Sequence, residues 1–138
     1  MSIPPSLVEV TDSVQEHEYI FFDSIASVIL MVSSREGPFK SVKEYMDCTR
    51  QQLETQLKEN FEDSTLSLIS CDRSLYYPEK STLVRFHVNK LPMGYTTYSI
   101  FFIHHRRKEI QIAFTYKDHP TINIQHYIAD VMKTMVLE

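Results

Sequence analysis

Two uninterrupted apolar runs constrain the fold more than any other feature of this sequence. Residues 28–32 read Val-Ile-Leu-Met-Val, and residues 100–103 read Ile-Phe-Phe-Ile. Short runs of β-branched and aromatic residues favour strands over helices. Because successive side chains of a strand point to opposite faces, each run gives bulky apolar groups to both faces of a sheet. We therefore expect a sheet whose two faces both need a cover.

Further strand-like segments precede and follow these runs. They span residues 6–10, 17–22, 66–71, 82–88 and 109–116, and the run at 100–103 belongs to a longer segment over residues 97–105. The last two flank Arg106-Arg107-Lys108, which we interpret as a hairpin turn whose charges keep the sheet edge from pairing with other chains.

Two amphipathic segments predict helices. Ser41 and Glu44 have the spacing of a capping box and open the first helix, which we expect to end near Asn60. The second opens at residues 118–120. The order β-β-β-α-β-β-β-β-α predicts a single α+β domain over residues 1–138, an antiparallel sheet with both helices packed on one face.

Composition argues against several classes of function. The net charge is −4, and the short basic run at 106–108 is a poor match for a phosphate backbone, so we expect no nucleic-acid partner. Only two glycines occur, which excludes phosphate-binding loops, dinucleotide fingerprints and nucleophile elbows. His104 and His105 are adjacent in a predicted strand and cannot hold one ion together. We expect no enzyme, no metal and no cofactor.

The N-terminal residues and the cysteines bear on location. Residues 1–5 lack the basic and apolar regions of a signal peptide, and no apolar run approaches the length of a membrane span. Cys48 and Cys71 are interpreted as small buried side chains in a reducing compartment. The expectation is a cytoplasmic protein with no stable membrane insertion.

A layer of two helices on one face would leave the other face of this apolar sheet uncovered. Exposed apolar patches of that size mark interaction sites. The cover could be the N-terminal arm of the chain, a second subunit, or an apolar segment of a client protein laid in a groove.

The order of elements, together with two short motifs, resembles a known family. Ser34-Arg35-Glu36 ends a strand, and Ser41-Val42-Lys43-Glu44-Tyr45 opens the helix that follows. The chain resembles the DcrB-like branch of the Mog1/PsbP superfamily, and within it the Eag chaperones of type VI secretion, which carry S-R-E/D and S-L-E-E-Y at these places.

That resemblance implies a homodimeric chaperone that shields the apolar N-terminal transmembrane helices of an effector protein. The helices would lie in an apolar groove on the sheet. Alternation along the strands predicts the groove residues as Ile20, Phe22, Leu30, Val32, Phe101 and Ile103. The same pattern leaves Ile110, Ile112 and Phe114 to the helix-covered core, although a slip of one residue would exchange the faces.

A second hypothesis stays open within the same superfamily. An immunity or regulatory protein would bind a folded partner through its loops and through the basic hairpin tip. Arg106 and Arg107 would then matter, and the face of the sheet would not.

Overall fold

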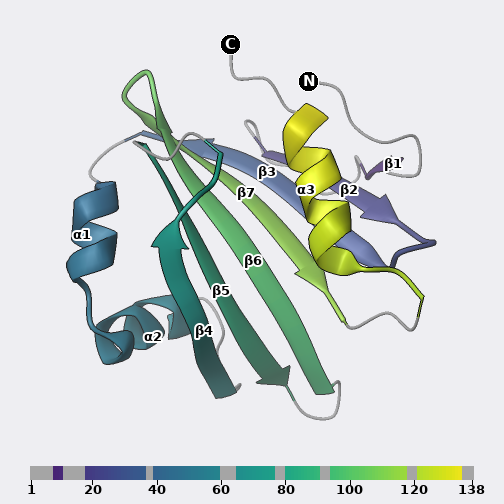
Figure 1. Ribbon diagram of the computed structural model, residues 1–138, viewed down its shortest axis with the longest axis horizontal. Coiled ribbons are helices and arrows are strands. Elements are labelled where there is room, and N and C mark those ends of the chain that lie inside the picture. Colours follow the sequence, from purple (N-terminus) through teal and green to yellow (C-terminus); the bar gives the residue numbers. More distant parts are fainter. Residues whose placement is uncertain are drawn as a thin grey trace.

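The computed structural model describes residues 8–10, 18–36, 39–59, 65–76, 80–90, 94–117 and 121–134. Seven strands form one sheet in the order β1-β2-β3-β7-β6-β5-β4, with every neighbouring pair antiparallel (Figure 1). The strands are Val8–Val10 (β1), Glu18–Asp23 (β2), Val28–Arg35 (β3), Thr65–Arg73 (β4), Ser81–Lys90 (β5), Gly94–His105 (β6) and Lys108–Tyr116 (β7). The predicted antiparallel α+β fold is confirmed.

The helices are α1 (Val42–Asp47), α2 (Arg50–Lys58) and α3 (Ile124–Thr134). The prediction of one continuous helix from Ser41 is wrong, because α1 ends at Cys48, whose backbone is extended. Ser41 caps α1 with the predicted capping box. Thr49 forms a second capping box: its Oγ1 accepts from the N–H of Gln52 at 3.1 Å, while the Gln52 side chain accepts from the N–H of Thr49 at 2.8 Å. A second N-cap inside the segment starts a new helix.

Helix α3 begins later than predicted. Its first residue is Ile124, and the Asn123 side chain accepts a hydrogen bond from the N–H of His126 at 3.1 Å, as an N-cap does. Residues 118–120, the predicted start, lie outside the described residues, as does Asn60.

The turn between β2 and β3 fixes α3 to the sheet. One oxygen of Asp23 accepts hydrogen bonds from the N–H groups of Ile25 and Ala26, both at 3.0 Å. The other accepts from the hydroxyl of Tyr127 on α3 at 2.8 Å. Asp23 is buried, so these bonds satisfy a carboxylate that would otherwise be costly to desolvate.

The helices pack on opposite faces of the sheet, which corrects the expectation of a single helical layer. The core beneath α3 contains Phe21, Val28, Leu30, Phe101, Ile103, Ile112, Phe114 and Tyr116 of the sheet with Ile124, Ile128, Val131 and Met132 of the helix. The core beneath α1 and α2 contains Tyr45, Leu53, Leu66, Leu68, Val84, Phe86, Val88 and Phe102. Helix α3 therefore covers the β2–β3–β7–β6 part of one face, and α1 and α2 cover the β4–β5–β6 part of the other (Figure 1).

Candidate functional site

The described helices lie diagonally opposite each other and leave one part of each face uncovered, and these two parts differ in chemistry. On the α3 face, the uncovered part of β4 and β5 carries Ser67, paired with His87, and Ser70, paired with Arg85. These side chains are polar, and within the described chain Ile69, at the bulge of β4, is the large apolar group beside them. Water solvates such a surface without cost, so it needs no partner.

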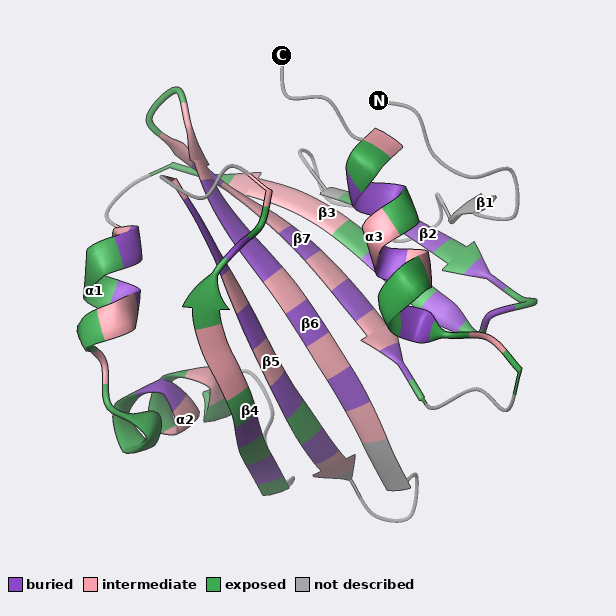
Figure 2. Ribbon diagram, viewed as in Figure 1, coloured by how far each residue is buried: buried purple, intermediate pink, exposed green. Residues whose placement is uncertain are grey.

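The uncovered part of the α1–α2 face is apolar. Ile20 of β2 pairs with Met31 of β3, and Phe22 pairs with Ile29. Phe22, Ile29 and Met31 are 42%, 40% and 38% exposed, and Figure 2 shows exposed bands on these two strands. We call Ile20, Phe22, Ile29 and Met31 the open surface. Neighbouring apolar groups left in water on one face mark an interaction site.

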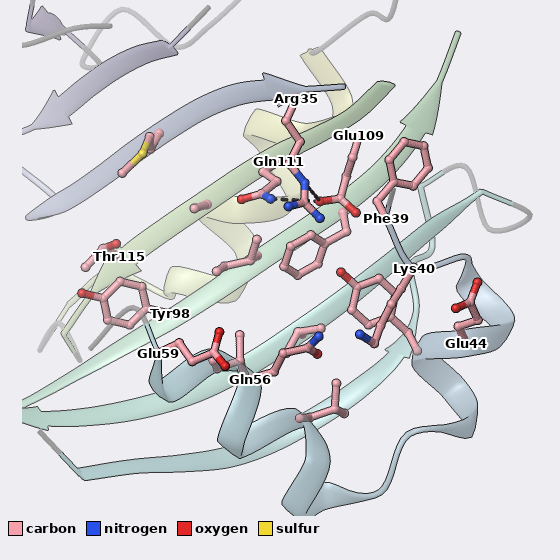
Figure 3. A pocket seen from close by; sticks show the side chains of 18 residues that line it. Arg35, Phe39, Lys40, Glu44, Gln56, Glu59, Tyr98, Glu109, Gln111 and Thr115 are labelled. Carbon is pink, nitrogen blue, oxygen red and sulfur yellow. Dashed lines mark hydrogen bonds and ion pairs between the residues drawn. The ribbon is translucent and has the colours of Figure 1, made fainter. Parts of the chain in front are cut away.

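A cleft of about 760 Å³ lies between the open surface and the two helices α1 and α2. Its lining includes Ile100 and Ala113 of the sheet, Leu53 of α2, and Tyr98 of β6, which Figure 3 labels. Met31 belongs both to the cleft and to the open surface. The two features therefore form one continuous depression on this face, apolar at the open surface and lined by both polar and apolar side chains in the cleft.

A buried carboxylate lies at one end of the cleft. Glu109 is 0% exposed, and its Oε1 accepts hydrogen bonds from Arg35 Nε at 3.2 Å and from Gln111 Nε2 at 2.9 Å (Figure 3). Its Oε2 has no hydrogen-bond partner among the described residues. His104 Nε2 is 3.9 Å from Oε2, beyond hydrogen-bond distance, and the ring of His104 lies 4.6 Å from that of Phe39.

Two further titratable groups near the cleft are held in their neutral forms. Burial, with a smaller effect of the nearby Glu109 charge, raises the pKa of the Tyr45 hydroxyl far above its usual value. Burial likewise raises the pKa of the Cys71 thiol from 9.0 to about 11. A raised thiol pKa is the opposite of what an activated nucleophile needs. Among the described residues, no three His, Cys, Asp or Glu side chains are grouped so as to hold a metal.

The structure divides the six residues predicted for the groove between the two faces. Ile20 and Phe22 lie on the open surface. Leu30, Phe101 and Ile103 are buried beneath α3 and Val32 packs against the same core, so the expectation that all six share one open face is wrong.

The reason is strand register. Leu30 pairs with Phe114 and Phe101 pairs with Ile112, and both partners belong to the core that was predicted correctly. Paired residues point to the same face, so Leu30 and Phe101 belong to the core as well. The residues that sequence reasoning missed are Ile29 and Met31, the alternate positions of the same apolar run. Their only signal was alternation, which does not say which face a helix covers.

No protein-family model matches this chain, and no curated protein matches it in sequence. Solved structures do match. The Ran-binding protein Mog1p of Saccharomyces cerevisiae aligns with a TM-score of 0.64 at 11% identity, covering 96% of this chain and 84% of that one. A Mog1 point mutant aligns with a TM-score of 0.63 at 11% identity over the same shares.

A cyanobacterial protein aligns equally well. The solution structure of PsbP from Synechocystis gives a TM-score of 0.63 at 14% identity, covering 95% of this chain and 81% of that one. None of the described helices is both long enough and apolar enough to cross a bilayer. At these identities the likeness concerns architecture, and the chain has a Mog1/PsbP-like α+β fold.

Proposed function

We propose that this protein binds an apolar helix of another protein in the depression formed by the open surface and the cleft. One observation carries the proposal. Two parts of the sheet are uncovered, and only the part that adjoins the cleft is apolar. If the absence of a cover had no function, both parts would be expected to be polar.

A helix suits this depression better than a strand does. A helix satisfies its own backbone hydrogen bonds and can lie on an apolar face without leaving polar groups unpaired. An added strand would pair with a sheet edge, at β1 or β4, and would not cover the face. On this face α1 and α2 cover the sheet from β4 to β6, and one further helix beside them would complete the layer.

The energetics require the cleft as well as the open surface. Phe22, Ile29 and Met31 are each about two-fifths exposed, and covering that fraction of a large apolar side chain contributes about 1 kcal/mol. With Ile20 the sum is about 4 kcal/mol, which does no more than offset the translational and rotational freedom lost on association, so the open surface alone gives no useful affinity. Useful affinity needs the cleft floor and the apolar surface of the partner in addition.

The finer form of the proposal is a cytoplasmic chaperone that shields the N-terminal transmembrane helices of a type VI secretion effector. The motifs at residues 34–36 and 41–45 support it, as does the apolar open surface beside the cleft. The structural likeness to a Ran-binding protein supports a protein partner in general. This proposal assigns no catalytic step to the chain.

Co-expression with an effector N-terminus that contains apolar helices tests the proposal. The wild-type chain is expected to keep the effector soluble and to co-purify with it. Ile29→Asp places a charge in the open surface and is expected to abolish co-purification. Ser67→Asp introduces the same negative charge at an exposed position of the polar uncovered part and is expected to have no effect on co-purification.

An Ile29→Asp protein that stays folded and still co-purifies with the effector would contradict the proposal. Light scattering on the two variants measures their mass and tests the homodimer hypothesis separately. A dimer formed through the open surface is expected to become monomeric with Ile29→Asp and to remain a dimer with Ser67→Asp.

The basic hairpin tip supports a second candidate, recognition of a folded partner. Arg106 and Arg107 are exposed and have φ angles of 50° and 66°, a region that non-glycine residues enter at a cost. Two arginines at such positions are unusual in a two-residue turn, which favours Asn-Gly. Reversal of both charges is expected to abolish binding under this hypothesis and to leave effector co-purification unchanged under the first.

A further inference from the structure

The buried carboxylate of Glu109 is incompletely satisfied. Both hydrogen bonds that it accepts go to Oε1, one from Arg35 and one from Gln111. Oε2 is fully buried and accepts none among the described residues, and its 3.9 Å contact with His104 Nε2 is too long for a hydrogen bond. An ionised oxygen without a donor is costly in a protein interior, because nothing replaces the water it has lost. Such an atom in a native structure points to a missing partner.

The position of Glu109 suggests where that partner comes from. Glu109 is the second residue of β7 and lines one end of the cleft, and Thr115 of the same strand lines the opposite end (Figure 3). A segment that lies in the depression therefore has one end beside Glu109. Three carboxylates line the cleft, those of Glu44, Glu59 and Glu109, and two cations, those of Arg35 and Lys40. The excess of one negative charge favours a cationic group in the cleft.

We propose that Glu109 receives a cationic side chain, a lysine or an arginine, which flanks the apolar helix of the partner. The inference rests on the proposed function and fixes the direction and the position of the bound helix in the depression. Apolar helices that span membranes are commonly flanked by lysine and arginine, which occupy the polar boundary. Because Oε2 has no accessible surface in the free chain, the cation reaches it only after a neighbouring side chain has moved aside; the charge-assisted hydrogen bond is then strong because water is excluded.

Fluorescence anisotropy with three labelled, end-blocked alanine–leucine peptides tests the inference. One carries a lysine at its amino end, one carries it at its carboxyl end, and the third has glutamine at both positions. The wild-type protein is expected to bind one of the lysine peptides about tenfold more tightly than the glutamine peptide, as a charge-assisted bond predicts. Equal affinity for all three overturns the inference and leaves the proposed function standing.

Two variants act on the same preference in opposite directions. Glu109→Gln replaces the unpartnered acceptor with an amide of nearly the same shape, and is expected to bring the lysine and glutamine peptides within about twofold of each other. Arg35→Gln removes the cation that now pairs with Glu109 and is expected to increase the preference for lysine. Arg35 is 54% exposed, so this second variant tests the inference even where Glu109→Gln impairs folding.

The failure of the two proposals can be told apart. If the wild-type protein binds none of the peptides, both are overturned. If binding is lost with Ile29→Asp but shows no dependence on lysine, only the role of Glu109 is overturned. If the preference for lysine survives unchanged in a folded Glu109→Gln protein, the cation binds elsewhere and the inference is wrong.

Discussion

Leu30 and Ile29 are neighbours on β3 whose side chains point to opposite faces, and truncating each to alanine tests the whole assignment of faces. Leu30 is 0% exposed and packs in the core beneath α3, whereas Ile29 is 40% exposed on the open surface. A fully buried leucine loses its transfer free energy and leaves a cavity between β3 and α3. The expected cost of Leu30→Ala is about 3 kcal/mol.

Ile29→Ala is expected to cost much less. Its side chain already contacts water, the surface can close over the lost methyl groups, and no enclosed cavity forms. The expected cost is about 1 kcal/mol or below. Urea denaturation followed by circular dichroism measures both values, and unchanged m-values would show that the two variants unfold from equally compact states.

Binding assays on the same two proteins are expected to give the reverse order. Ile29→Ala weakens binding of an apolar helix, and Leu30→Ala leaves it near the wild-type value at temperatures where the variant is folded. Equal destabilisation by the two substitutions would refute the reasoning, and a larger cost for Ile29→Ala would mean that β3 is shifted by one residue.

Three further experiments probe features outside the open surface. Arg106→Asn with Arg107→Gly gives the hairpin a sequence that accepts positive φ, and should raise the free energy of unfolding by about 1–2 kcal/mol in thermal denaturation. Tyr127→Phe removes the 2.8 Å donor to a buried carboxylate and should cost about 2 kcal/mol, against about 1 or less for Tyr76→Phe, whose hydroxyl bonds a neutral carbonyl at 3.4 Å. Alkylation of Cys71 by iodoacetamide, followed by mass spectrometry, should show a midpoint near the pKa of about 11. The folded chain holds this proton more tightly than the unfolded chain, so the thiol adds stability below pH 9.0 that is lost as pH rises toward 11.

Local patterns were enough to predict the strands and the start of the first helix. The runs that became β3 and β6 are rich in side chains that fit a pleated surface, and Ser41 forms the expected capping box. The break after α1 also had a local signal, since Thr49 and Gln52 have capping-box spacing. It was missed because Thr49 also fits the apolar face of one longer helix.

What the sequence alone determined is the order of the strands, the start of the first helix, and the fact that both faces of the sheet are apolar along β3 and β6. Which helix covers which face is a property of the tertiary structure, because the alternation of a strand is the same whichever face is called inner. Only the register of Leu30 opposite Phe114, with α3 above both, places Leu30 in the core and leaves Ile29 exposed. That Glu109 Oε2 accepts no hydrogen bond among the described residues is likewise decided by the tertiary structure, since its neighbours Arg35 and His104 come from other strands.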